Sequence, residues 1–158
     1  MLAANKELNP AGIADILEAG DPANAESLIR SSIEQFRKEK QVSEEVSAHD
    51  SLAETLLELG KVAEAKAEIA QATKLTDKNQ KPSSRLKTQI AAARLLYAEG
   101  KPDDAIRSLR LSIRDARKAG LFIHELEATL ALGKIEARSG KTRESQALLL
   151  SASPAGID

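Results

Sequence analysis

Glycines recur at a spacing of 40 residues along this chain, and this repeat constrains its fold more than any other feature. The glycines are Gly20, Gly60, Gly100 and Gly140. A small residue follows each glycine after five positions, an aliphatic one after nine and a second small one after twelve. These sets are Ala25, Ala65, Ala105 and Ser145; Ile29, Ile69, Leu109 and Leu149; and Ser32, Ala72, Ser112 and Ala152. The recurrence of whole sets is typical of stacked supersecondary units.

Each unit is predicted to be a helix, a tight turn and a second helix. Glycine adopts the left-handed conformation that ends a helix, and Pro22 and Pro102 then stand where a first-turn proline is tolerated. With 27 Ala and 21 Leu against three Val and three aromatic residues, the composition favours helices and excludes a β-sandwich or barrel. The sequence therefore predicts an all-α fold. We expect helices at 10–19, 22–39, 44–59, 62–77, 84–98, 102–118, 122–139 and 142–152, with longer links at 40–43 and 77–83.

The repeat resembles the tetratricopeptide repeat family. Leu132-Gly133 stands ahead of Gly140, and residues 60–65 read Gly-Lys-x-x-Glu-Ala, which 100–105 echo. The resemblance covers residues 10–152 and implies a right-handed superhelix of antiparallel helix pairs, an α-solenoid of about four repeats. It implies one domain over 1–158, with repeats at 4–40, 44–80, 84–120 and 122–153. The period of 40 departs from the common 34-residue form, and Leu56, Leu96 and Glu136 replace its bulky aromatic residues.

The long repeat also resembles arrays attached to bacterial signalling proteins. Residues 120–142 are similar to the C-terminal repeat region of some bacterial serine/threonine kinases and winged-helix regulators. The chain carries neither a kinase glycine-rich loop nor a catalytic-loop signature. The resemblance therefore implies a non-catalytic sensor or docking domain, which acts as a scaffold for protein–protein interaction.

No residue pattern in the sequence indicates catalysis or a metal site, so we predict no enzyme activity, no cofactor and no metal. The chain has no cysteine, and His49 and His124 lack neighbours at metal-ligand spacing, so both are expected to be partly exposed helix residues. The carboxylates of Glu44-Glu45 and Asp103-Asp104 point apart on a helix and suit its first turn.

Charge and hydropathy restrict the partners and the location. The formal net charge is −1, which does not favour nucleic acid, and no apolar run approaches the ~18 residues of a membrane span. A cytoplasmic location is expected, or an extracytoplasmic one if the parent is membrane-anchored. One helix carries an arginine stripe that fits either an anion or acidic-protein site or a solvated outer face: Arg107, Arg110, Arg114 and Arg117.

In the tetratricopeptide family, the first helix of each repeat lines a concave groove that binds a partner segment. We transfer the groove positions of the family to this chain by their distance from the repeat glycines. The groove residues are then Asp50, Glu54 and Leu57 in the second repeat, Lys87, Ile90, Arg94 and Tyr97 in the third, and Lys134 and Arg138 in the fourth. One end of this groove is acidic and the other basic. The resemblance implies a protein or peptide segment as partner. The basic cluster around Tyr97 predicts that this segment is acidic, while ordinary solvated charge is the alternative for the basic end.

Self-association is the alternative function. Residues 1–80 hold 9 Lys and Arg against 15 Asp and Glu, a balance of −6, whereas residues 81–158 hold 14 against 9, a balance of +5. Leu148 and Leu150 fall outside the repeat frame and are expected to be exposed at the end of the solenoid. These features predict a weak homodimer through the terminal repeats.

Overall fold

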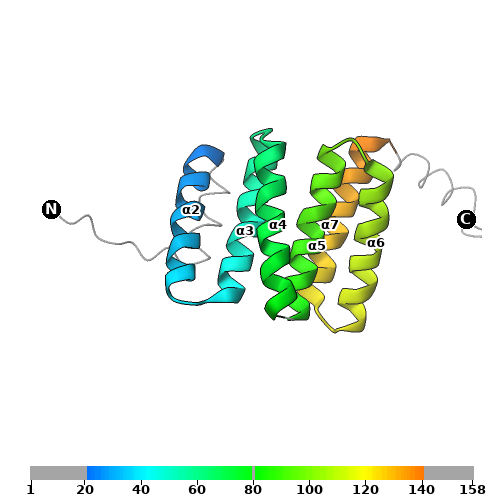
Figure 1. The fold of residues 1–158 in the computed structure, drawn as a ribbon. Helices are drawn as coiled ribbons and strands as arrows, with labels where there is room; N and C mark the ends of the chain where they lie inside the picture. The colour runs from blue at the N-terminus through cyan, green and yellow to red at the C-terminus, as the bar shows by residue number, and fades with distance from the viewer. Residues whose placement is uncertain (1–20, 80, 141–158) are drawn as a thin grey trace, which may run out of the picture.

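A computed structural model describes residues 21–79 and 81–140, and this part of the chain is an array of helices without a strand (Figure 1). The helices are α2 (Pro22–Lys38), α3 (Val42–Glu58), α4 (Val62–Asn79), α5 (Pro82–Ala98), α6 (Pro102–Lys118) and α7 (Phe122–Ser139). The all-α solenoid expected from the repeat is thus confirmed. The helices expected at 10–19 and 142–152, together with Leu148 and Leu150, lie outside the described residues.

The helices form two layers. Each helix packs against its neighbour in the chain, and in addition α3 packs against α5 and α5 against α7. The first helices of successive repeats, α3, α5 and α7, therefore lie side by side, and the second helices, α2, α4 and α6, form the other layer. Figure 1 shows the whole array extending from α2 at one end to α6 and α7 at the other. None of the described helices combines the length and the apolarity that crossing a membrane would require.

The repeat positions identified in the sequence form the core. In the described residues, every small or aliphatic residue at five, nine and twelve positions after a repeat glycine is buried. The buried apolar side chains form two clusters, one spanning α2 to α5 and the other spanning α5 to α7. Ala91 and Leu95 of α5 belong to the first cluster, and Ile90 and Ala93 belong to the second. Helix α5 therefore joins the two cores.

The turns at residues 40, 60, 100 and 120 share one backbone geometry. Gly60, Gly100 and Gly120 have positive φ angles of 74°, 79° and 67°, and Lys40 takes the same place with a φ of 57°. The amide of residue 60 donates to the carbonyl of Leu57, and that of residue 40 donates to the carbonyl of Arg37. These four turns are thus the same, whether or not a glycine is present.

The long link expected at 77–83 is wrong. Helix α4 continues to Asn79 and α5 begins at Pro82, and α3 likewise begins at Val42 rather than at residue 44. Pro82 stands in the first turn of α5. A proline is tolerated there because the first amides of a helix have no partner within the helix. The polar residues that suggest a loop therefore belong to two helix ends.

Candidate functional site

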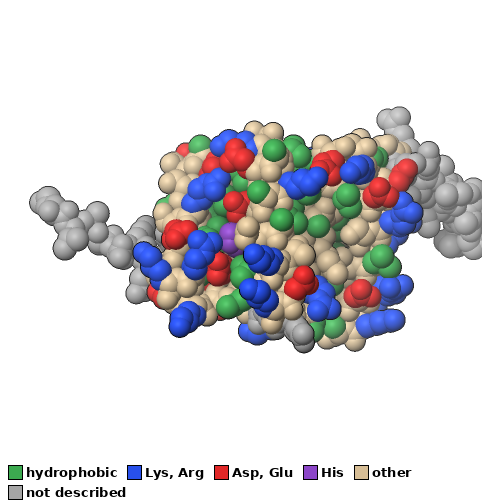
Figure 2. Space-filling view, in the orientation of Figure 1, with side chains coloured by type: hydrophobic (Ala, Val, Ile, Leu, Met, Phe, Trp, Pro, Cys, Tyr) green, Lys and Arg blue, Asp and Glu red, His purple; other side chains and the backbone are tan. Residues whose placement is uncertain are grey.

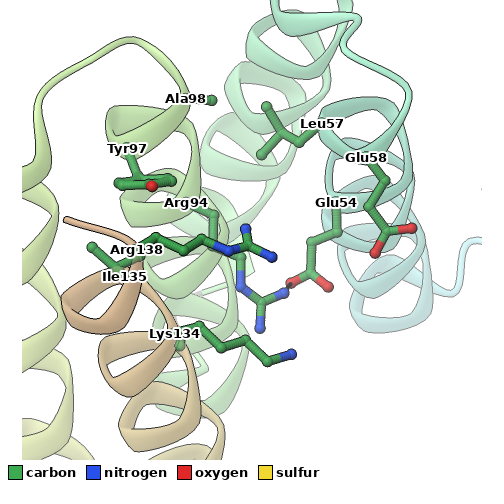
Figure 3. A pocket seen from close by; sticks show the side chains of 10 residues that line it. Glu54, Leu57, Glu58, Arg94, Tyr97, Ala98, Lys134, Ile135 and Arg138 are labelled. Carbon is green, nitrogen blue, oxygen red and sulfur yellow. Dashed lines mark ion pairs between the residues drawn. The ribbon is translucent and has the colours of Figure 1, made fainter. Parts of the chain in front are cut away.

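A pocket opens between the first helices of three repeats. Its volume is about 310 Å³, and its walls come from α3, α5 and α7 (Figure 3). The lining residues are Glu54, Leu57, Glu58, Arg94, Tyr97, Ala98, Ala131, Lys134, Ile135 and Arg138. Six of the nine groove residues expected from the sequence are among them: Glu54, Leu57, Arg94, Tyr97, Lys134 and Arg138.

The repeat itself brings these side chains together. Glu54, Arg94 and Lys134 are separated by 40 residues each, so they occupy one register position on three parallel helices. Leu57 and Tyr97 share a second register position. Because successive first helices pack side by side, residues at one register position form a row across the pocket. The identity of each residue in the row then sets the local charge.

The charge changes sign across the pocket. Glu54 and Glu58 project from α3, whereas Lys134 and Arg138 project from α7. Between them, the Arg94 Nη1 atom lies 2.5 Å from Glu54 Oε1. The protein atoms packed around Glu54 raise the pKa of its carboxyl by excluding water, and the positive charges of Arg94 and Lys87 act in the opposite direction.

Lys134 and Arg138 remain without a carboxylate partner among residues 21–79 and 81–140. Figure 3 shows both side chains directed toward the Glu54–Arg94 pair. Two carboxylates, of Glu54 and Glu58, thus share the pocket with three cations. Beside them lies an apolar surface formed by Leu57, Tyr97 and Ile135. The pocket therefore combines unpaired positive charge with an apolar patch.

Three expected groove residues do not line the pocket. Ile90 is buried in the core cluster of α5, α6 and α7, and Asp50 is fully buried between α3 and α5. Lys87 is half-buried, and its charge acts on both Asp50 and Glu54. Asp50 and Ile90 thus lie too deep in the contact between neighbouring helices to reach the surface of the groove, whereas Lys87 reaches solvent outside the lining of the pocket.

Asp50 has an unusual environment. Its Oδ2 atom accepts a hydrogen bond of 3.0 Å from the Thr88 hydroxyl, while Oδ1 is buried with no hydrogen-bond partner among the described residues. Burial raises the pKa of Asp50 to about 7, and the Thr88 hydrogen bond and the Lys87 charge only partly oppose this effect. Asp50 thus takes up a proton near neutral pH as a result of its packing.

His49 is buried rather than partly exposed as expected from the sequence. Its Nδ1 atom lies 2.6 Å from Glu68 Oε2, and its Nε2 atom lies 3.8 Å from Glu45 Oε1. Arg30 and Arg37 pair in turn with Glu68 and Glu45. This network joins α2, α3 and α4. The sequence offers no signal for it, because residues 89 and 129, at the same register position, are Gln and Thr.

The arginine stripe of α6 is paired along its whole length. Arg107 contacts Asp104, and Arg110, Arg114 and Arg117 lie 3.1, 3.4 and 2.7 Å from carboxylate oxygens of Glu136, Asp115 and Glu125. Figure 2 shows positive and negative side chains interspersed over the face that α2, α4 and α6 present. The pairing favours the interpretation of the stripe as a solvated outer face.

Stacked helix pairs with a groove along one layer define the chain as a helical-repeat protein. The tetratricopeptide repeat family model matches residues 46–71 and 87–110. The matched segments cover less than half of the chain and fall on the pairs α3–α4 and α5–α6, so these two helix pairs are similar to tetratricopeptide repeats. No curated protein and no solved structure matches the chain. Tetratricopeptide repeats are generally protein–protein interaction modules, in which a concave surface binds the partner and the fold is typically a non-catalytic scaffold.

Proposed function

We propose that the pocket between α3, α5 and α7 binds a segment of a partner protein that carries acidic residues beside an apolar one. The observation that supports this proposal most strongly is the pair of unpaired cations, Lys134 and Arg138, next to the apolar patch. An acidic side chain would pair with these cations. An apolar side chain would bury the parts of Leu57 and Tyr97 that are still exposed in the pocket.

Tyr97 is the anchor in this proposal. Its ring is half-buried in the wall of the pocket, beside Leu57 and Ile135. A tyrosine offers a large apolar face together with a hydroxyl that can form a hydrogen bond, and this combination is common in binding surfaces. Arg94 already pairs with Glu54, so we assign it a positioning role and assign the contact with the acidic residue to Lys134 and Arg138.

The context we propose is a non-catalytic docking or sensor domain of a bacterial signalling protein. The similarity of residues 120–142 to the repeat regions of such proteins supports this context. Dimerisation through Leu148 and Leu150 is the alternative proposed function, and it concerns residues outside the described part of the chain. In both cases the chain acts through contact rather than through a reaction.

Fluorescence anisotropy with a labelled peptide tests the groove. The peptide carries Asp and Glu around a Leu-Phe pair, and a second peptide replaces its acidic residues by Lys. We expect micromolar binding of the acidic peptide only, with weaker binding as salt rises from about 20 to about 150 mM, because exposed charges are screened at the higher concentration. The double variant Lys134→Glu, Arg138→Glu should weaken binding at least about tenfold, which corresponds to ~1.4 kcal/mol.

The matched control is Arg107→Glu, Arg114→Glu. It changes the net charge by the same amount on the outer face of α6, so binding of the acidic peptide should stay close to that of the unaltered chain. Equal losses of peptide binding in the two double variants would mean that the net charge of the chain, and not the cations in the pocket, determines the binding. Equal binding of both peptides, or binding that does not respond to salt, would contradict the proposal as well.

A further inference from the structure

The two walls of the pocket carry unpaired charges of opposite sign. Glu58 on the α3 wall is exposed, and its carboxylate forms no hydrogen bond or ion pair within the described residues. Lys134 and Arg138 on the α7 wall also lack a carboxylate partner there, whereas Glu54 is already paired with Arg94. The pocket therefore offers a free carboxylate on one wall and two free cations on the other.

The repeat keeps these charges apart. Glu58 and Arg138 occupy one register position on α3 and α7, and Ala98 of α5 occupies the same position between them. Ala98 has no charge, so this row of the pocket is acidic at one end, neutral in the middle and basic at the other end. Figure 3 shows Glu58 on the helix opposite the one that carries Lys134 and Arg138.

The apolar anchor of the proposed function stands between the two walls. Tyr97 belongs to α5, which lies between α3 and α7. Neighbouring helices pack about 8–10 Å apart, so the axes of α3 and α7 are roughly 16–20 Å apart. The long side chains of both walls reach inward and shorten the distance between their charges. An extended segment rises about 3.3 Å per residue, so two charges about four residues apart on it can meet both walls.

We propose that the partner segment is bipolar, with a basic residue on the side of its apolar anchor that faces α3 and an acidic residue on the side that faces α7. This inference rests on the proposed groove function and extends it from the α7 wall to the α3 wall. Glu58 then disfavours segments that are acidic on both sides, because like charges opposite one another select against a wrong partner. Glu58 is thus a specificity-determining residue of the groove.

Two labelled peptides separate this inference from the groove function. The bipolar peptide has Lys and Asp four positions apart with a Leu-Phe pair between them, and the acidic peptide differs only in having Glu in place of Lys. Each peptide is made in both chain directions, and the tighter direction is compared. In fluorescence anisotropy at low salt we expect the bipolar peptide to bind about three- to tenfold more tightly, because an ion pair with Glu58 replaces a like-charge contact.

Glu58→Lys reverses the charge of the α3 wall. It should abolish the preference for the bipolar peptide and bind the acidic peptide more tightly than the unaltered chain does. Glu44→Lys is the matched control, since it makes the same charge change at an exposed position of α3 outside the pocket lining, and it should keep the preference.

The outcomes distinguish the two proposals. If the unaltered chain binds both peptides equally, or if Glu58→Lys keeps the preference for the bipolar peptide, the bipolar segment is wrong and the groove function stands. If neither peptide binds, the groove function is refuted, and the bipolar segment with it.

Cysteine cross-linking locates the two ends of the segment. The chain contains no cysteine, and Leu57 and Ala137 occupy one register position on α3 and α7. Leu57→Cys and Ala137→Cys therefore place a single thiol on either wall. A bipolar peptide with a cysteine beside its basic residue should form a disulfide mainly with Leu57→Cys, and one with a cysteine beside its acidic residue mainly with Ala137→Cys. The same preference for both peptides would overturn the proposed arrangement.

Discussion

Lys40 closes α2 in a conformation that suits glycine. A residue with a Cβ atom pays about 1–2 kcal/mol for the left-handed conformation, and the Lys40 side chain makes no hydrogen bond or ion pair within the described residues. We therefore expect Lys40→Gly to raise the free energy of unfolding by about 0.5–1 kcal/mol, measured by urea denaturation.

The reverse change is the control. Gly60 has the same turn geometry, and an added Cβ atom would meet nothing within 4 Å. Gly60→Lys should therefore destabilise the chain through backbone strain alone, by about 1 kcal/mol. A loss of stability in Lys40→Gly, or no change in Gly60→Lys, would show that the backbone angle at these turns does not determine their energy.

Asp50 makes the stability of the chain depend on pH. Its pKa is raised from the ordinary value of 3.8 to about 7 in the folded chain. Between these two values the folded state holds a proton that the unfolded state has lost, so Asp50 lowers stability progressively as pH rises from about 4 to about 7. The rise in the pKa of Asp50 from 3.8 to about 7 corresponds to a loss of at most ~4 kcal/mol in the free energy of unfolding at high pH.

Asp50→Asn removes this titration and can still accept the Thr88 hydrogen bond. We expect the stability of the variant, relative to the unaltered chain, to increase from pH 4 to pH 8 in urea denaturation series. Glu58→Gln, an exposed carboxylate on the same helix, should show a much smaller trend. A difference between Asp50→Asn and the unaltered chain that is constant with pH would contradict the raised pKa.

At the scale of elements, small residues set how closely the helices approach. Ala65 of α4 and Ala105 of α6 are fully buried at the same repeat position. Leucine at either site would overpack the contact, so we expect a loss of about 1–3 kcal/mol in unfolding free energy. Ala67→Leu on the exposed face of α4 is the matched control and should change stability by less than about 0.5 kcal/mol. Equal effects at Ala65 and Ala67 would mean that this contact is not tightly packed.

The helices themselves could be predicted almost to the residue from the sequence. Their turns carry glycine or the same hydrogen-bond pattern, and their buried faces follow the repeat. The expected bounds are wrong at the end of α4, which continues to Asn79, and at Val42 and Pro82, where polar residues suggested loops and the structure has the first turns of α3 and α5. A helix start tolerates such residues because its first amides need no partner within the helix.

At the scale of the whole molecule, α5 connects two cores and separates two charge environments. Carboxylates of α3 form one wall of the groove, cations of α7 form the other, and the Glu54–Arg94 pair lies between them. A segment that lies across the groove would therefore meet opposite charges at its two sides. This polarity would fix the direction in which the proposed partner binds, in addition to strengthening its attachment.

The sequence by itself determined the all-α repeat, its helix pairs and the small residues between them, because these features depend on local preferences repeated at one period. It also indicated six residues of the pocket, since side-by-side stacking of identical units brings one register position into a row. The tertiary structure decided which positions reach solvent. Asp50, Ile90 and His49 are buried, and the arginines of α6 are paired. These outcomes depend on how closely neighbouring helices approach and on which long side chains meet between them, and a repeat period does not specify either.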